Sequence, residues 1–424
     1  MKGLLETAAA VLLVVRRSLR QHALSTVVTV GSVALASGLV LAVVSLQAQT
    51  YEAFTAGPVG FDAVLGARGS QLQLVLNTVF HLETSPGNLS WETYETIRKD
   101  PRVALAIPYA VGDNYQGFRI VGTTADLFQA FEPRPGERLS FAGEGRAFAP
   151  SAREAVVGSY AAARTGLRVG SRFNPYHGVV FDEKQKHDDE YVVVGVLRPT
   201  NTPSDRVVWI PLEGVYRMSG HVLRGTGSAY TPRAGEEIPD ASKEVSAVML
   251  KLRTPQAGFA LDQTINKQGR VATLAWPIGR VMAELFDKLG WANRVLTLIA
   301  YLTSLVASGS ILASLYNTMN ERRREFAILR ALGARRATVF SAIVVEAATI
   351  ALCGTLVGYA VYAAILLVAR AVVRAQTGVV LDPLYLHPAL WLGPLAMVAL
   401  GALAGVLPAL KAYSTDVATG LASS

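Results

Sequence analysis

Two histidines and a run of carboxylates in the segment NPYHGVVFDEKQKHDDEYVVV could together bind a metal ion. The candidate ligands are His177, His187, Asp188, Asp189 and Glu190. Imidazole combined with carboxylate suits zinc and related metals. The alternative is a solvated hairpin between the strands GVVF and YVVV. Two histidines ten residues apart do not define a site by themselves, and His221 lies too far along the sequence to be counted with them.

A single carboxylate, Glu346, lies inside the otherwise uncharged stretch 337–369. If this stretch crosses a membrane, its carboxylate is costly to bury and marks a functional site by default. Glu346 is about two helical turns from the start of the stretch. At that depth it could also reach headgroup water or a serine on a neighbouring helix. Two interpretations therefore stay open, a proton-linked or interface function and simple helix packing.

No pattern of a self-contained enzyme accompanies these residues. Serine, histidine and aspartate occur without the surroundings of a nucleophile elbow, and HExxH is absent. The sequence contains neither GxxxxGK(S/T) nor even a Gly-Lys dipeptide, so it cannot cradle nucleotide phosphates as a P-loop does. Its one cysteine, Cys353, excludes an internal disulfide and a cysteine-based zinc cluster. We therefore expect no catalytic residues in this chain.

The composition indicates which elements hold these side chains. Only 17% of the 424 residues are charged and 51% are hydrophobic, whereas an ordinary soluble domain has about a quarter charged residues. Four long apolar runs stand out, over 23–51, 295–319, 337–369 and 388–410. A helix needs about 20 mostly apolar residues to cross a hydrocarbon core about 30 Å thick. The predicted fold class is therefore a membrane protein with four transmembrane α-helices.

The distribution of charge predicts how these spans are oriented. Residues 1–23 carry a net charge of +3, and residues 321–336 carry +4 with six arginines. Residues 52–291 hold 26 basic and 26 acidic side chains. Because positive charge favours the cytosolic side, we expect both termini and the arginine-rich loop in the cytosol, with 52–291 and the short outer loop 370–387 outside. This orientation also accounts for the net charge of +8 without invoking nucleic acid.

The long segment between the first two spans is large enough for one or two soluble domains. Short β-branched runs such as FRIVGTT, EYVVVGVL and VSAVMLKL predict strands, and SWETYETIRKD predicts a helix capped by Ser90. We therefore expect a large extracytoplasmic α+β domain over 52–280, inserted between spans 1 and 2. Apolar residues at helical spacing then predict a stiff stalk helix over 281–294 that runs into the second span.

Three cytosolic segments complete the layout. Residues 1–22 are apolar first and basic afterwards, the reverse of a secretory signal, and predict an amphipathic helix at the membrane surface. Residues 411–424 form a neutral tail. Residues 320–336, NERRREFAILRALGARR, place apolar side chains three and four apart opposite charged ones, with Gly333 as a helix stop. Topology alone would need only the arginines, so the acidic residues and the apolar face favour a helix that docks a cytosolic partner.

The stretch NERRREFAILRALGARRATVF resembles the coupling-helix signature of FtsX/MacB-type ABC transporter permeases. The order of one span, a large outer domain and three further spans is similar as well, and DNYQGFRIVGTT looks like part of the MacB-like periplasmic domain of that family. The resemblance implies a homodimer, or a pair of related permeases, bound to a separate cytosolic ABC ATPase. That ATPase would bind ATP and Mg, and no cofactor is expected in this chain.

On the matching positions, the resemblance assigns the ATPase-coupling contact to Glu321, Arg324, Glu325, Leu329, Arg330, Leu332 and Gly333. It implies a permease subunit in the bacterial inner membrane that passes ATP-driven movement to its periplasmic domain, a mechanism called mechanotransmission. Its substrate would be periplasmic or lipid-like and would be extracted or exported, with a periplasmic adaptor or lipoprotein as a further partner. The alternative is a non-transporting regulator of a periplasmic partner such as a cell-wall hydrolase, or a metal-handling complex.

Overall fold

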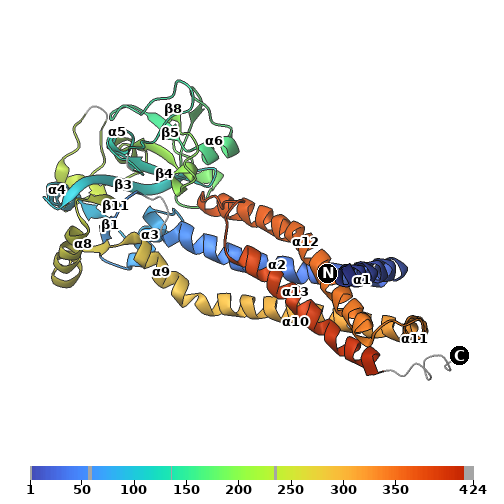
Figure 1. Ribbon diagram of the computed structural model, residues 1–424. Helices are drawn as coiled ribbons and strands as arrows, with labels where there is room; N and C mark the ends of the chain where they lie inside the picture. Colours follow the sequence, from blue (N-terminus) through green and yellow to red (C-terminus); the bar gives the residue numbers. More distant parts are fainter. Residues whose placement is uncertain (1, 56–59, 135, 234–235, 415–424) are drawn as a thin grey trace. The chain divides into compact units, whose positions relative to one another are not determined.

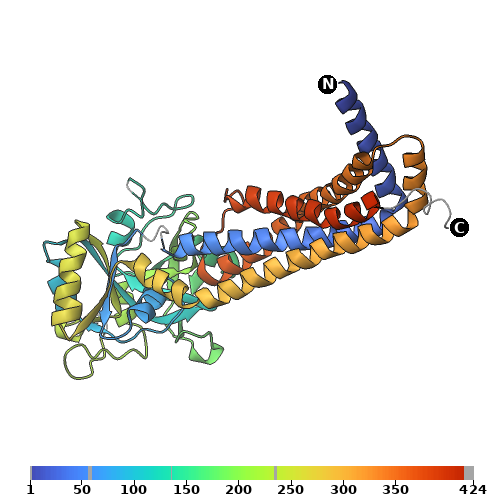
Figure 2. The same ribbon diagram turned by 60° about the horizontal axis from the view of Figure 1, so that its bottom comes forward.

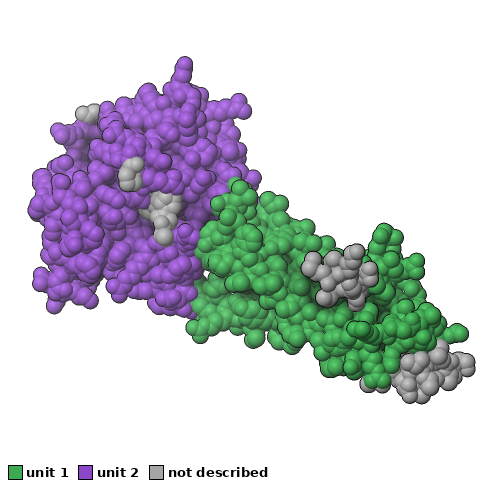
Figure 3. All heavy atoms as spheres, viewed as in Figure 1, with its two compact units in different colours: residues 1–50, 289–370, 382–424 green, residues 51–288, 371–381 purple. Residues whose placement is uncertain are grey.

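The computed structural model describes residues 2–55, 60–134, 136–233 and 236–414. The chain divides into two compact units, which Figure 3 shows in different colours. The first, the helical unit, comprises Met1–Thr50, Leu289–Arg370 and Asp382–Ser424. The second, the sheet unit, comprises Tyr51–Lys288 and Ala371–Leu381.

Four long helices correspond to the four apolar runs (Figure 1). They are α2 (Ala23–Thr55), α10 (Gly290–Glu321), α12 (Arg336–Thr377) and α13 (Ala389–Ser414). All four are long and apolar enough to cross a membrane. Helix α13 begins one residue later than its run, and the Pro388 carbonyl accepts a hydrogen bond from the Leu392 N–H, as the carbonyl before a first turn does.

Glycines let α12 pack closely against both α2 and α13 (Figures 1 and 2). A Cβ atom at Gly358 of α12 would lie 2.0 Å from Ser37 Oγ of α2. A Cβ atom at Gly401 of α13 would lie 2.4 Å from Ala351 Cβ of α12. Close backbone approach is what drives helix association in lipid, where apolar burial gains little. The core shared by the four helices includes Val33, Ile311, Ile350 and Met397.

Two shorter helices, α1 (Lys2–Gln21) and α11 (Arg323–Ala331), complete the helical unit. In α1, Val11 and Val15 are buried one turn apart and pack with Ala342 of α12, while the arginines of α1 are exposed. Helix α1 is therefore amphipathic, as its sequence predicts, and its apolar stripe contacts a neighbouring helix. Its position at the membrane surface stays a prediction.

The sheet unit is an α+β domain built around one mixed sheet of ten strands. The hydrogen-bonded order is β12-β1-β11-β3-β4-β9-β5-β8-β6, and β7 pairs with β3 off this path. The strands are β1 (Ala63–Ala67), β3 (Val103–Tyr115), β4 (Phe118–Thr123), β5 (Glu154–Val157), β6 (Arg172–Phe173), β7 (Tyr176–His177), β8 (Tyr191–Val196), β9 (Val208–Pro211), β11 (Ala247–Leu252) and β12 (Ala272–Ala275). A separate pair joins β2 (Leu89–Ser90) to β10 (Glu244–Val245).

Strand β3 is the longest strand and links the two halves of the sheet. Its first part pairs with β11 and its second part with β4, both antiparallel. The register with β4 shifts between Val111 and Asp113, and a bulge of this kind redirects the side chains that follow it. Two buried clusters form the core, one around Tyr191 and Ile210 and the other around Trp209.

Short helices connect the strands, and local sequence sets the start of one and the end of another. They are α3 (Gln71–Thr78), α4 (Trp91–Arg98), α5 (Asp126–Gln129), α6 (Ser159–Thr165), α7 (Leu212–Tyr216), α8 (Pro255–Asp262) and α9 (Ile278–Lys288). Ser90 caps α4, because its side chain accepts the Thr93 N–H. Gly166 ends α6 with a φ of +75°, a conformation that glycine adopts at little cost.

The predicted stalk over 281–294 is not one continuous helix. Helix α9 ends at Lys288, and α10 begins at Gly290 after the single non-helical residue Leu289. Glycine is among the weakest helix formers, so the interruption falls where helix propensity is lowest. The segment predicted as a stalk is therefore helical on both sides of Leu289, with its break beside Gly290.

Candidate functional site

Helix α11 follows α10 directly and has one face packed against its own chain. Phe326 and Ala327 are buried, and Phe326 lies in a cluster with Val339 and Ile343 of α12 and Ala409 of α13. Apolar contacts on this face hold the short helix in place, since nine residues alone would be marginally helical in water. Helix α11 is therefore in direct contact with α12 and α13.

The opposite face of α11 is exposed and mixes charged with apolar side chains. Arg324, Glu325 and Ile328 are exposed there, and Leu332 just beyond the helix is 80% exposed. Arg324, Ile328 and Leu332 recur every four residues, which places them along one side of a helix. We call Arg324, Glu325, Ile328 and Leu332 the outer face of α11.

Gly333 ends the helix in the manner that its sequence predicts. Its φ is +97°, its N–H donates to the Arg330 carbonyl, and the Ala334 N–H donates to the Leu329 carbonyl. These two hydrogen bonds make a Schellman motif, which satisfies carbonyls that the last turn would otherwise leave unpaired. The conformation of Gly333 thus fixes the direction in which the chain leaves the outer face.

The seven residues assigned to ATPase coupling do not all lie on one surface. Arg324, Glu325 and Leu332 belong to the outer face, and Glu321 is exposed at the end of α10. Leu329 is half-buried and packs beside the inner cluster. The remaining two, Arg330 and Gly333, lie in and just after the last turn. Ile328 was not among the seven, although its spacing of four from Leu332 was a usable signal.

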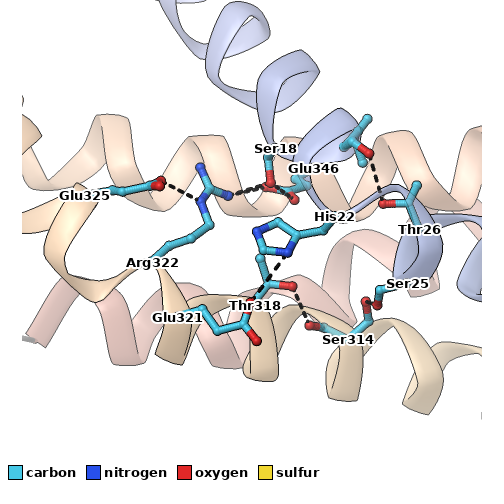
Figure 4. A network of polar contacts seen from close by, with 11 residues as sticks. Ser18, His22, Ser25, Thr26, Ser314, Thr318, Glu321, Arg322, Glu325 and Glu346 are labelled. Atoms are coloured by element: carbon cyan, nitrogen blue, oxygen red, sulfur yellow. Dashed lines mark hydrogen bonds and ion pairs between the residues drawn. The ribbon is translucent and has the colours of Figure 1, made fainter.

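A buried network of polar contacts joins α1 and α12 to the junction between α10 and α11 (Figure 4). Arg322, between α10 and α11, directs Nη1 to Ser18 Oγ of α1 at 2.5 Å and to Glu346 Oε2 of α12 at 3.3 Å. Ser18 Oγ in turn donates to Glu346 Oε1. All three side chains are buried. The serine that one reading of Glu346 required is therefore Ser18, and the arginine was not anticipated from sequence.

Arg322 also connects this buried network to the outer face. Its Nε lies 3.1 Å from Glu325 Oε2, and its guanidinium lies 4.8 Å from the centre of the Phe326 ring. On the neighbouring turn, His22 Nδ1 lies 3.5 Å from Glu321 Oε2. Glu325 thus touches solvent on one side and the buried arginine on the other.

A second candidate site lies in the sheet unit, where four residues bring possible metal ligands together. Asp113, His177, His187 and His221 each contribute a ligand atom, and these atoms lie within 4.8 Å of one another. Asp113 on β3 is the direct register partner of His177 on β7. The backbone N–H of His187 donates to the Pro175 carbonyl, and His221 lies in the turn after helix α7.

The metal ligands suggested by sequence fall into two groups. His177 and His187 come together as expected. Asp188 and Glu190 are not part of the cluster, and Glu190 pairs with Arg172. Setting His221 aside because of its sequence distance was wrong, because the β3–β7 pairing and the turn after α7 bring it to the same point.

Asp189 supports the cluster without joining it. Its carboxylate accepts the Ser219 N–H at 2.6 Å and pairs with Arg153 at 2.5 Å. The Ser219 carbonyl in turn lies 2.7 Å from His187 Nδ1. Asp189 therefore positions the backbone that orients His187.

The environment of the cluster perturbs two of its pKa values. Burial raises the pKa of Asp113, but its contacts with His187 and His221 outweigh burial and bring the pKa to about 2. Burial lowers the pKa of His187, but Asp113 and the Ser219 carbonyl raise it overall. Asp113 is therefore a carboxylate at neutral pH, buried among imidazoles.

Family comparisons agree with both units. The model of the MacB-like periplasmic core domain matches residues 24–265, more than half of the chain. The model of the FtsX-like permease C-terminal domain matches residues 297–417. The second match contains α11 and its Gly333 stop.

Curated relatives point to the same family. The macrolide export ATP-binding/permease protein MacB of Shewanella sp. strain W3-18-1 is 25% identical over 242 residues, covering 54% of this chain and 33% of the relative. The protein of the same name from Shewanella oneidensis is 26% identical over 239 residues, with the same coverage. The chain thus spans about a third of the length of the curated relatives it matches.

Two solved structures are similar at low identity. The periplasmic region of MacB from Actinobacillus actinomycetemcomitans has a TM-score of 0.33 and 12% identity, covering 54% of this chain and 94% of that one. The extracellular domain of the ABC-type transporter YknZ has a TM-score of 0.28 and 13% identity, with coverages of 50% and 97%. The family matches, together with the four apolar helices, confirm the resemblance seen in the sequence. This chain belongs to the FtsX/MacB-type family of ABC transporter permeases, inner-membrane proteins with a periplasmic domain.

Proposed function

We propose that this chain is a permease subunit that couples ATP hydrolysis by a separate ABC ATPase to movement of its periplasmic domain. The ATPase docks on the outer face of α11 in the cytosol and carries the ATP and Mg. The movement serves to extract or export a periplasmic or lipid-like substrate. A second copy of this chain completes the permease, and a periplasmic adaptor or lipoprotein is a further partner.

The observation that carries this proposal is the two-sided construction of α11. One side exposes Ile328 and Leu332 between charged residues, a combination suited to a partner with an apolar slot and a charged rim. The other side is held by Phe326 and by the buried Arg322, which contacts α1 and α12. A force on the outer face would therefore be transmitted to α1, α12 and α13 through these side-chain contacts.

Two further observations support the proposal. The 424 residues contain no P-loop sequence, so ATP hydrolysis requires a domain outside them. The net positive segments 1–23 and 321–336 favour a cytosolic location for both termini and for α11. The MacB relatives are named ATP-binding/permease proteins, and the match to this chain covers only a third of their length.

Charge reversal on the outer face is expected to uncouple the ATPase. With the chain in nanodiscs together with its ABC ATPase, Glu325→Lys and Arg324→Glu should each lower permease-dependent ATP hydrolysis about tenfold. Measured below saturation, where the rate is proportional to the amount of bound ATPase, this corresponds to about 1.4 kcal/mol of docking free energy. ATPase rate and membrane insertion are the two measurements.

Glu137→Lys provides the control, because Glu137 is an exposed glutamate of the sheet unit paired only at the surface with Arg134. It should leave the rate unchanged. Glu325→Lys also breaks the contact of Glu325 with Arg322, so its effect alone could come from inside the chain. Arg324→Glu tests the docking surface without altering that contact. Normal ATPase rates in both outer-face variants would refute docking at this site.

A further inference from the structure

Each of the three histidines of the sheet unit brings a ring nitrogen to Asp113 at a distance found between two ligands of a tetrahedral metal ion. His177 Nδ1 and His187 Nε2 each lie 3.3 Å from Asp113 Oδ1, and His221 Nε2 lies 3.3 Å from Oδ2. Ligand atoms about 2.0–2.1 Å from a tetrahedral zinc ion are about 3.3 Å apart. The three imidazole rings also meet nearly edge to face, with interplanar angles of 71–83°.

Hydrogen bonds on the far side of two rings fix which nitrogen faces the carboxylate. His187 Nδ1 lies 2.7 Å from the Ser219 carbonyl, and His221 Nδ1 lies 3.0 Å from the Val215 carbonyl. A carbonyl only accepts, so each Nδ1 carries the proton. In the neutral rings, both Nε2 atoms therefore direct lone pairs toward Asp113. This is how a second shell prepares histidine for metal binding.

Two lone pairs that face a buried carboxylate repel it unless a proton or a cation lies between them. His221 Nε2 is buried and has no hydrogen-bond partner among the described residues. Asp113 is 1% exposed. Among the described residues, its ion-pair partners are all histidines. A buried carboxylate normally needs a compensating charge. One divalent cation between the four residues would supply it and accept one lone pair from each residue.

We propose that Asp113, His177, His187 and His221 bind one zinc ion. Three imidazoles and one carboxylate are ligands of the borderline kind that zinc prefers, and four of them complete a tetrahedral site. The ion joins the segment after β7 and the turn after α7 to strand β3. His177 is exposed, with 56% of its side chain accessible, so zinc reaches the site from solvent.

Zinc titration of the full-length chain in detergent micelles, after removal of metal by a chelator, tests the inference. We expect one zinc ion per chain, measured against a competing indicator dye. Co²⁺ should bind in its place and give the intense visible absorption of tetrahedral cobalt. His221→Ala and His177→Ala should each weaken zinc binding by at least about 100-fold, since even second-shell changes cost 10–100-fold.

Asp188→Asn and Glu190→Gln are matched controls, because both residues belong to the same acidic run but lie outside the cluster. They should bind zinc as the unaltered chain does. Thermal unfolding without metal checks that His177→Ala, at an exposed position, is folded. Absence of saturable zinc uptake would overturn the inference and leave an imidazole–carboxylate cluster only. Equal zinc affinity of the His221→Ala variant and the unaltered chain would also overturn the inference. The measurement needs no ATPase, so its outcome is independent of the proposed function.

Discussion

Replacing Arg322 by methionine is expected to destabilise the helical unit by about 3 kcal/mol, because the change leaves the buried Glu346 without its cation. Arg322 and Glu346 are 6% and 5% exposed, and their nearest polar atoms are 3.3 Å apart. Ser18 would remain as a hydrogen-bond donor to Glu346, but a hydroxyl cannot neutralise a carboxylate. Unfolding of the purified chain in mixed micelles, followed by circular dichroism, gives the free-energy difference.

A double-mutant cycle separates the ion pair from the loss of packing. The double variant Arg322→Met with Glu346→Met should recover stability to within about 1 kcal/mol of the unaltered chain, because two apolar side chains replace the pair. Arg294→Met serves as a control at an exposed arginine of α10 and should change stability by less than about 0.5 kcal/mol. The cycle also needs the single variant Glu346→Met. If the stability losses of Arg322→Met and Glu346→Met added up in the double variant, Arg322 and Glu346 would not interact as described.

Leu332→Asp is expected to weaken binding of the ATPase about 30-fold while leaving the chain itself folded. Leu332 is 80% exposed and makes little contact with its own chain, so its own-chain stability should change by less than about 0.5 kcal/mol. At the centre of a docking surface, an apolar anchor of this kind typically contributes about 2 kcal/mol. The dissociation constant between ATPase and nanodisc-embedded chain is the measurement.

Val271→Asp is the matched control for Leu332→Asp. Val271 is an exposed apolar residue of the sheet unit, 72% exposed, and lies far along the chain from α11. The same aspartate there should leave ATPase binding unchanged. If the Leu332→Asp variant and the unaltered chain bound the ATPase with equal dissociation constants, Leu332 would be excluded from the docking surface.

The sequence predicted those features that follow from local patterns. Uncharged length predicted the four long helices. Gly333 was identified as a helix stop because few other residues adopt a φ of +97° without strain. Each of these depends on neighbours within a few residues.

Features that depend on long-range pairing were not predictable in the same way. Asp113 and His221 join His177 only because β7 pairs with β3 and a turn follows α7. Arg322 meets Ser18 across 304 positions of sequence. The spacing of residues along the sequence does not reveal contacts between distant segments, and each buried polar residue has many candidate partners. The inward orientation of Leu329 likewise depends on α12 and α13 and not on α11 alone.

Photo-crosslinking in intact membranes tests the central claim most directly, which is that the outer face of α11 docks the ABC ATPase. A photoreactive amino acid placed at position 332 should yield a covalent adduct with the ATPase, and one placed at position 271 should yield none. An ATPase adduct from position 271, or none from position 332 in membranes where chain and ATPase still co-purify, would contradict the account.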